Sequence, residues 1–235
     1  MQCVILAAGR GVRMGDLTND APKPMLRIKG RPILEYTLAN LPEEISEVIF
    51  VIGYKGDLIK SYFGDEYKGK KIKYVVQENL NGGAAALHLA KEFLDETFLV
   101  LNGDDLYQKS DLKKLINNEP PAFLAKELDE PPGRFGVCKT NSDGYLLEII
   151  ESGMPRDENI KLINSGAYFL NKIFFDYPLV KKSTKIDEKE FGLPQTLATM
   201  AKDCKIKVEK AEFWQPVGYP EDILKAEEII SRGFY

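Results

Sequence analysis

The sequence predicts an α/β protein in which a mostly parallel sheet carries helices on both faces. Strand-like segments that are apolar on both faces alternate with helix-like segments through the first half of the chain. The chain has 235 residues, 44% of them hydrophobic and 29% charged, so a large core can form without disulfides or a metal. No internal repeat, long linker or low-complexity tract interrupts it. We therefore expect one domain, residues 1–235.

The first half supplies the alternating elements. Residues 2–8 (QCVILAA) are typical of a buried strand, and Pro32 opens a segment with apolar residues at helical spacing. The expected order is strand 2–8, helix 32–41, strand 47–53, helix 55–63, strand 71–77, helix 84–94 and strand 97–106.

The second half is less regular. Residues 134–151 predict a hairpin that turns at residues 141–144, and residues 163–170 predict a further strand. Helices are expected over residues 188–202 and 220–231.

Charge and composition exclude several classes of function. The formal net charge of −4 argues against a large basic face, and so against nucleic acid as the main partner. No apolar stretch approaches the length of a membrane span, and the opening run is too short for a signal peptide. The three cysteines form no zinc or disulfide pattern, and Cys3 is expected to be a buried thiol. We therefore expect a cytoplasmic protein with no membrane partner.

Three polar segments follow predicted strands: the loop after residue 8, the loop 77–83 and the cluster 102–105. In open α/β sheets ligands bind beyond the carboxyl ends of the strands. These segments can therefore face one crevice.

The first loop, LAAGRGVRM (6–14), has the small residues that let backbone N–H groups approach an anion. Arg13 adds a fork of donors for phosphate oxygens. The alternative is an ordinary glycine turn. Ten residues after Arg13, Lys23 lies between Pro22 and Pro24, which stiffen the backbone and so hold the lysine in place. The alternative is a solvated lysine in a loop.

The second loop begins with Gln77 and contains Gly82. A glutamine amide can accept from a ring N–H and donate to a neighbouring carbonyl, the pair that uracil and thymine present. Gly82 would let the backbone lie against the base. Alternatively, this is a polar strand end that leads into a helix.

The third cluster places Asp104 at a strand end, where it can hold Mg²⁺ that bridges phosphates. The alternative is an Asx turn. Asp105 should point to the opposite face. The one histidine, His88, lies in a predicted helix, which argues against Ser-His-Asp and Cys-His triads.

In this order the motifs resemble those of the sugar-phosphate nucleotidylyltransferases (NDP-sugar pyrophosphorylases), of the glucose-1-phosphate uridylyl- and thymidylyltransferase type. The likeness continues through RFGV (134–137), the Glu151 segment, INSGAYFL (163–170) and GYPEDILKAE (218–227). It implies a Rossmann-like three-layer α/β/α fold with a mostly parallel mixed sheet, as in nucleotide-diphospho-sugar transferases. Residues 1–107 would be the nucleotide-binding half and 108–235 the sugar-phosphate-binding half.

The resemblance also implies the reaction: an NTP, with UTP or dTTP favoured, gives its nucleoside monophosphate to a sugar 1-phosphate and releases pyrophosphate, with Mg²⁺ as cofactor. A sugar phosphate is already an anionic nucleophile, so the attack on the α-phosphorus needs no general base. Arg13, Lys23 and Asp104 would be catalytic, with Asp104 as the metal ligand. The other implied contacts are Leu6, Ala7, Ala8, Gly9, Gly11, Arg13, Gln77 and Gly82 for the nucleotide, and Gly103, Gly136, Glu151 and Asn164 for the sugar phosphate.

Three positions depart from the family pattern. Val12 replaces a threonine of the loop, and Ser152 replaces a lysine that grips the sugar phosphate. Pro216 stands where many members have a second metal-binding aspartate, and Asp222 is expected to cap the last helix instead.

Two alternatives therefore stay open: a non-catalytic regulatory protein that binds nucleotide sugars, and a transferase with a non-sugar phosphate acceptor. The joint presence of Arg13, Lys23 and Asp104 favours the active sugar transferase. The sequence carries no signature of an oligomeric state.

Overall fold

The computed structural model describes residues 1–130, 133–152, 154–157, 159–182 and 189–233. The strands are β1 (Gln2–Ala7), β2 (Arg27–Ile28), β3 (Arg31–Pro32), β4 (Glu47–Ile52), β5 (Glu66–Tyr67), β6 (Lys70–Val76), β7 (Thr97–Asn102), β8 (Asp105–Tyr107), β9 (Ala122–Glu127), β10 (Val137–Thr140), β11 (Leu146–Ile150), β12 (Leu162–Asn171), β13 (Lys207–Lys210) and β14 (Trp214–Pro216). The helices are α1 (Ile33–Ala39), α2 (Gly56–Phe63), α3 (Gly83–Leu89), α4 (Lys109–Ile116), α5 (Leu193–Met200) and α6 (Pro220–Ser231), with short 3₁₀ helices η1 (Val12–Thr18), η2 (Lys23–Met25), η3 (Lys91–Phe93) and η4 (Lys172–Asp176).

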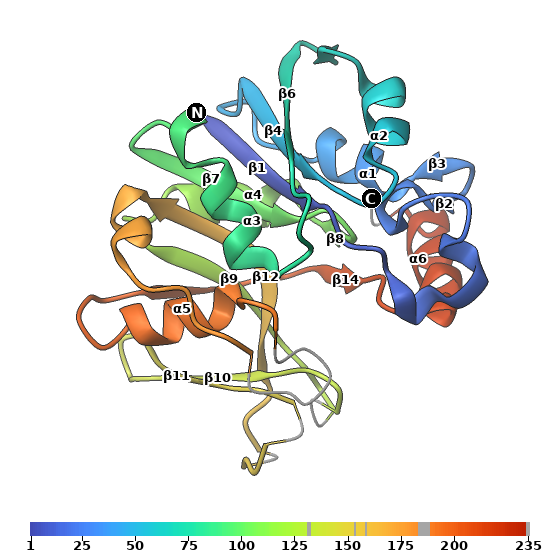
Figure 1. Cartoon of the computed structure of the whole chain (residues 1–235). Coiled ribbons are helices and arrows are strands. Elements are labelled where there is room, and N and C mark those ends of the chain that lie inside the picture. The colour runs from blue at the N-terminus through green and yellow to red at the C-terminus, as the bar shows by residue number, and fades with distance from the viewer. Residues whose placement is uncertain (131–132, 153, 158, 183–188, 234–235) are drawn as a thin grey trace.

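The main sheet is mixed, with the order β11-β10-β12-β7-β1-β4-β6-β5, and β9 lies between β12 and β13. Its central strands β7, β1, β4 and β6 are parallel, whereas β12 runs antiparallel to β7. The expected Rossmann-like α/β fold with a mostly parallel mixed sheet is confirmed (Figure 1).

The register of the central strands brings the polar segments to one edge. Ala7 pairs with Ile52, Leu6 with Asn102, and Ile52 with Val76. Three segments continue from these strand ends: the glycine loop (residues 6–14), the Gln77 loop (residues 77–83) and the turn at Gly103–Asp104. The crevice expected from the sequence therefore lies at the carboxyl edge of the sheet.

Residues of the central strands alternate between two apolar cores. Cys3, Ile5 and Phe50 face the core that includes residues of α1, α2 and α4. Val4 and Ile49 face the opposite core, which includes residues of α3 and α5. Helices thus cover both faces, which makes the strands apolar throughout and explains their clear sequence signal (Figure 1).

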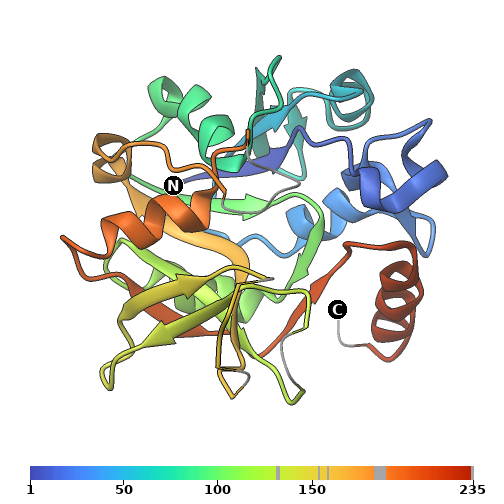
Figure 2. The same ribbon diagram turned by 60° about the horizontal axis from the view of Figure 1, so that its bottom comes forward.

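The C-terminal segment returns to the N-terminal half. Strand β14 pairs with β8, and α6 packs against η1 and β2 around a third apolar cluster that contains Met14, Ile28 and Val217. Figure 2 shows α6 beside the N-terminal loop, on the side of the molecule away from the β10–β11 hairpin. The proposed boundary between two halves at residue 107 is therefore bridged by a strand pair.

Several expected elements differ in their bounds. The helix expected over 84–94 is α3, which ends at Leu89 and is followed by η3. The strand expected over 97–106 is two strands, β7 and β8, because the chain turns at Gly103–Asp104. The helix expected over 188–202 is α5; residues 189–192 precede it in other conformations, and residue 188 lies outside the described residues. The hairpin and the last helix were predicted correctly.

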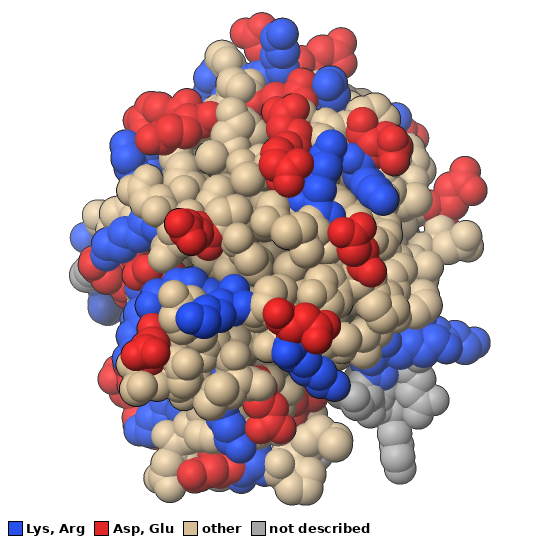
Figure 3. Space-filling view, turned by 90° about the vertical axis from the view of Figure 1, so that its left-hand side faces the viewer, with Lys and Arg blue, Asp and Glu red and all other residues tan. Residues whose placement is uncertain are grey.

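Figure 3 shows one face of the molecule, on which lysine and arginine side chains are mixed with aspartate and glutamate. Within the described part of the chain, no helix combines the length and apolarity that crossing a bilayer requires. Cys3, Cys138 and Cys204 are free thiols, and burial raises the pKa of the Cys3 thiol, as expected for a cysteine inside a core.

Candidate active site

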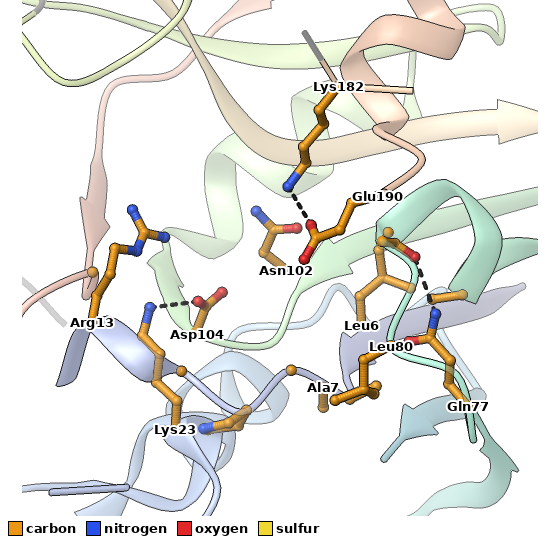
Figure 4. A pocket seen from close by; sticks show the side chains of 18 residues that line it. Leu6, Ala7, Arg13, Lys23, Gln77, Leu80, Asn102, Asp104, Lys182 and Glu190 are labelled. Carbon is orange, nitrogen blue, oxygen red and sulfur yellow. Dashed lines mark hydrogen bonds and ion pairs between the residues drawn. The ribbon is translucent and has the colours of Figure 1, made fainter. Parts of the chain in front are cut away.

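A cavity of about 300 Å³ opens at the carboxyl edge of the central strands. Its walls come from the glycine loop, η2, the Gln77 loop, the β7–β8 turn and the chain on either side of residues 183–188 (Figure 4). The predicted residues that line it are Leu6, Ala7, Ala8, Gly9, Gly11, Arg13, Lys23, Gln77, Gly82 and Asp104. The structure therefore gathers the predicted catalytic and nucleotide-binding residues around one space.

The glycine loop is held close to η2. Gly11 has φ +73°, and a Cβ atom there would lie 2.7 Å from Cβ of Lys23. Both the backbone conformation and the contact require glycine. The loop thus fixes the position of the lysine stem that passes beneath it.

Lys23 and Asp104 form an ion pair across the cavity floor, with Nζ 2.6 Å from Oδ2. The side chain of Lys23 is 8% exposed and that of Asp104 is 33% exposed. A nearly buried ammonium needs a paired anion, and Asp104 supplies it while keeping one side open to the cavity. The two residues are 81 positions apart, and the parallel register brings them together.

Arg13 enters the cavity from η1, and its guanidinium lies over the ring of Tyr219, 5.4 Å from the centroid. The guanidinium of Arg134 also lies over the Tyr219 ring, 4.4 Å from its centroid. Arg134 also pairs with Asp222 at 2.7 Å, and Asp222 accepts hydrogen bonds from the N–H groups of Gly218 and Tyr219. The expected capping role of Asp222 is confirmed.

Gln77 is 4% exposed, and its amide nitrogen donates to Oδ1 of Asn81 at 3.0 Å and to the carbonyl of Gly82 at 3.2 Å. These bonds use both hydrogens of the amide, so its oxygen is the group left for a ligand. The expected donation from Gln77 to a carbonyl of the base is therefore wrong for this arrangement, because both donors are engaged within the loop. Gly82 has φ +104°, and a Cβ there would lie 2.4 Å from the carbonyl oxygen of Phe191. Phe191 also bonds Asn81 and Ala84 through its backbone, which holds this loop open to the cavity.

None of the predicted sugar-phosphate residues lines the cavity. Gly136, Glu151 and Asn164 come from the β10–β12 region, whereas Gly103 lies in the turn between β7 and β8. Glu151 accepts a hydrogen bond from Gln195, and a Cβ on Gly136 would lie 3.8 Å from its Oε2. Burial raises the pKa of Glu151, and the charge of Lys182 opposes this shift. Asn164 lies in β12, where its Oδ1 accepts a hydrogen bond from the N–H of Gly166 at 2.7 Å. Among the described residues the buried Oε1 of Gln195 has no hydrogen-bond partner, so a polar ligand could satisfy it.

Gly103 belongs to the turn between the strands. It is buried, and its N–H donates to the carbonyl of Leu6 at 3.0 Å. A Cβ there would lie 3.0 Å from the same oxygen, so the residue lets β7 end against β1. Its backbone position sets the direction of Asp104.

The departure at Pro216 is visible in the pairing of β14 with β8, where Pro216 lies opposite Asp105. Asp105 is buried outside the cavity lining. Burial and the neighbouring Asp104 raise its pKa to about 7. The expectation that Asp105 points away from the ligand side is consistent with this placement.

Sequence reasoning assigned no role to several cavity residues: Leu80, Lys182, Glu190 and Gly218. Asn102 belongs to the cluster 102–105 that was expected to face the crevice, and it lines the cavity. Lys182 pairs with Glu190 at 2.6 Å, on the side of the cavity away from Lys23 (Figure 4). No sequence motif marks these two residues. They lie in a stretch rich in lysine and glutamate, which is typical of a solvated loop.

Comparison with known proteins gives one family match over almost the whole chain: a model described as nucleotidyl transferase covers residues 2–233. A UTP–glucose-1-phosphate uridylyltransferase, AglF of Haloferax volcanii, is 33% identical over 237 residues, which cover 97% of this chain and 96% of that protein. A D-glycero-α-D-manno-heptose 1-phosphate guanylyltransferase of Campylobacter jejuni is 33% identical over 94% of this chain and 96% of its own length. The chain spans about half the length of other relatives, such as the bifunctional protein GlmU of Methanocaldococcus jannaschii, which is 33% identical over 98% of this chain and 54% of that protein.

Solved structures agree on the fold. A UDP-glucose pyrophosphorylase complexed with UDP-glucose superposes with a TM-score of 0.83 at 20% identity, covering 99% of this chain and 98% of that one. HddC from Yersinia pseudotuberculosis, complexed with GMP-PN, superposes with a TM-score of 0.74 at 28% identity, covering 97% and 99%.

Proposed function

The chain belongs to the nucleotidyl transferase family, and on that premise we propose that it transfers a nucleoside monophosphate from a nucleoside triphosphate to a sugar 1-phosphate. The observation that carries the proposal is the cavity in which the glycine loop, Arg13, Lys23, Gln77 and Asp104 meet. Relatives of full matching length use different bases, UTP in one name and guanylyl transfer in another. The relatives therefore agree on the type of reaction and differ in the base of the nucleotide.

The triphosphate lies on the glycine loop in this proposal. Backbone N–H groups of residues 8–11 approach the phosphate oxygens, since small residues leave them uncovered. Arg13 and Lys23 add positive charge from two sides of the loop. These cations stabilise the pyrophosphate as it departs.

Asp104 fits a magnesium ligand. It presents one partly exposed carboxylate to the cavity, and Mg²⁺ commonly takes one or two carboxylates and completes its shell with phosphates and water. When bound there, the ion would neutralise charge on the phosphates. Among the described residues no group of three or more aspartate, glutamate, histidine or cysteine side chains could hold a metal, which suits a site that relies on the nucleotide for ligands.

Gln77 selects the base in this proposal. Because its amide hydrogens are engaged, the remaining oxygen accepts from a ring N–H. Uracil and thymine have such a group at N3 and guanine has one at N1, whereas neutral cytosine and adenine present an unprotonated ring nitrogen there. We therefore expect UTP, dTTP or GTP as the donor, and disfavour CTP and ATP.

The chemical step joins two anions. An oxygen of the sugar phosphate attacks the α-phosphorus, a new P–O bond forms, and the bond from the α-phosphorus to the bridging oxygen breaks, so that pyrophosphate leaves with the electron pair. No proton has to be removed from the nucleophile. The protein's contribution is to position the two phosphates and to neutralise their charge.

The test is a matrix of pyrophosphate-release assays. The protein is incubated with each of UTP, dTTP, GTP, CTP and ATP, with Mg²⁺, and with one of four acceptors. The acceptors are glucose 1-phosphate, N-acetylglucosamine 1-phosphate, D-glycero-α-D-manno-heptose 1-phosphate and phosphocholine. Release with at least one pair supports the transferase. Retained nucleotide-sugar binding without release from any pair would favour the regulatory alternative, and release only with phosphocholine would favour a non-sugar acceptor.

Substitutions at the cavity floor test the assignment of roles. We expect Asp104→Asn and Arg13→Ala each to lower turnover by about tenfold or more. Arg13→Ala removes a positive charge that stabilises the departing pyrophosphate, and Asp104→Asn removes the carboxylate that would hold Mg²⁺. Asp16→Asn and Arg232→Ala are matched controls at exposed residues outside the cavity lining, and should retain near wild-type turnover. Near wild-type turnover in both cavity variants would remove Asp104 and Arg13 from the site.

A further inference from the structure

We propose that Lys182 binds the phosphate group of the sugar 1-phosphate, on the side of the cavity opposite Lys23. This inference rests on the proposed function, which requires two anions to meet in one cavity. It assigns a cation to the acceptor side of the cavity, a charge that Ser152 does not supply.

The position of Lys182 supports the assignment. It lines the same cavity as Arg13, Lys23 and Asp104, and in Figure 4 its ammonium group points into the cavity from the side away from Lys23. Its side chain is 29% exposed, so a ligand can reach it. Its N–H donates to the carbonyl of Glu190 at 2.8 Å, which fixes the backbone from which it extends.

Lys182 also acts on the group of residues expected to contact the sugar. Its positive charge opposes the effect of burial on the Glu151 carboxyl. Lys182 therefore lies within electrostatic range of Glu151 and also lines the cavity proposed to hold the triphosphate. In a sugar 1-phosphate, the phosphate group connects the sugar, which is expected near Glu151, to the reacting oxygen in the cavity.

Two walls of positive charge suit a reaction between anions. Arg13 and Lys23 can hold the triphosphate, but repulsion would still keep a second phosphate away from the α-phosphorus. An ammonium on the facing wall offsets this repulsion and holds the nucleophilic oxygen near the phosphorus. Lysine is a common phosphate ligand and acts as a point charge with three donors.

Glu190 forms an ion pair with Lys182. Its Oε2 lies 2.6 Å from Nζ, and its side chain is 35% exposed in the same cavity. In the absence of an acceptor it satisfies the ammonium, and when the phosphate arrives it competes for the same donors. Loss of the lysine and loss of the glutamate should therefore affect acceptor binding in opposite directions.

A purely structural ion pair makes a different prediction. If the ion pair only holds residues 182 and 190 together, Lys182→Gln and Glu190→Gln break the same contact. The two variants should then change the KM for the sugar 1-phosphate equally and in the same direction. Comparison of the two variants separates the two roles.

The experiment measures pyrophosphate release with UTP and glucose 1-phosphate, each varied in turn, for wild type, Lys182→Gln, Lys182→Arg and Glu190→Gln. If the wild type prefers another pair in the matrix above, that pair is used. We expect Lys182→Gln to raise the KM for the sugar 1-phosphate about tenfold, the scale of one charge-assisted contact, and to change the KM for the nucleotide less than about twofold. Lys182→Arg should restore most of the affinity, and Glu190→Gln should leave that KM unchanged or lower it. Lys181→Gln is the control, since Lys181 is exposed and lies outside the cavity lining.

Thermal unfolding checks that each variant is folded. Equal increases of the sugar 1-phosphate KM in Lys182→Gln and Glu190→Gln would overturn the inference in favour of a purely structural ion pair, and an unchanged KM in Lys182→Gln would also overturn it. Absence of pyrophosphate release by wild type with every pair would instead overturn the proposed function, and the inference with it.

Discussion

At the scale of single residues, contacts within the protein determine which groups of a side chain remain available to a ligand. Gln77 has its amide hydrogens committed within its own loop, so only its oxygen can select a base. Lys23 is nearly buried and held by Asp104, so its charge is fixed in place before a nucleotide arrives. Such prior orientation lowers the cost of binding and of catalysis.

Glu151 provides a prediction at this scale. Burial raises its pKa above the ordinary value of 4.5, and the charge of Lys182 partly opposes the shift. Because only the ionised form is a pure acceptor for sugar hydroxyls, kcat/KM for the acceptor should fall as pH decreases through this raised pKa. Glu151→Gln cannot ionise, so its profile should lack that acid limb and should lie about tenfold below wild type at pH 8.

The acceptor's own phosphate also titrates, and it contributes equally to both profiles, so their difference isolates Glu151. Glu148→Gln is a suitable control, since Glu148 lies in β11, which ends just before Glu151, is exposed and pairs with Lys139. A wild-type profile that falls no more steeply at low pH than that of Glu151→Gln would exclude this role for Glu151. The raised pKa also means that the neutral form is favoured in the folded state, so stability declines as pH rises through the pKa, and Glu151→Gln should lose no stability at pH 8.

At the scale of elements, the ends of the central strands position the loops that line the cavity. Strands β1, β6 and β7 end at matching registers, and each hands the chain to a loop that reaches the cavity. The loop before α3 is fixed from outside by Phe191, whose backbone bonds Asn81 and Ala84. A segment more than 100 positions away therefore shapes the base-binding loop.

Gly82→Ala tests this contact. The new Cβ would lie 2.4 Å from the carbonyl oxygen of Phe191, so either the loop or the residue 191 segment must move. We expect a loss of about 2–4 kcal/mol in the free energy of unfolding, measured by urea titration, and weaker binding of UTP or GTP.

Gly64→Ala is the matched control. Gly64 has φ +61° and ψ −154°, a backbone region as restrictive as that of Gly82, but a Cβ there meets nothing within 4 Å. It should cost only the backbone strain, about 1–3 kcal/mol, and leave nucleotide binding unchanged. Equal losses in the two variants would mean that the contact with Phe191 contributes nothing.

At the scale of the whole molecule, the two proposed halves share structure. Strand β14 crosses back to pair with β8, and α6 packs on the loop that carries Arg13. The sole tryptophan, Trp214, lies in β14 and pairs with Tyr107. Its fluorescence can therefore report whether the C-terminal segment unfolds together with the first half.

We expect cooperative unfolding of one domain. Phe50→Ala removes a fully buried ring from β4 that stacks near Phe63 and Tyr74, which should cost about 3–5 kcal/mol. Urea transitions followed by circular dichroism and by Trp214 fluorescence should shift together. Leu147→Ala, at a side chain that is 62% exposed, should shift neither. A Trp214 transition that does not move in Phe50→Ala would show that the halves unfold independently.

The sequence by itself determined the alternation of the first half, the ends of its central strands and the residues that follow them, including Arg13, Lys23, Gln77 and Asp104. These signals are local: apolar periodicity marks a buried strand, and parallel strands must end at a common edge. Only the tertiary structure decided the insertion of β12 between β7 and β9, the return of β14 to β8, the pairing of Lys23 with Asp104 and the place of Lys182. Strands β9, β13 and β14 were not expected from the sequence. Short strands pair with partners far along the chain, and a lysine in a charged stretch carries no mark of the cavity it faces, because both depend on packing between segments that no local pattern records.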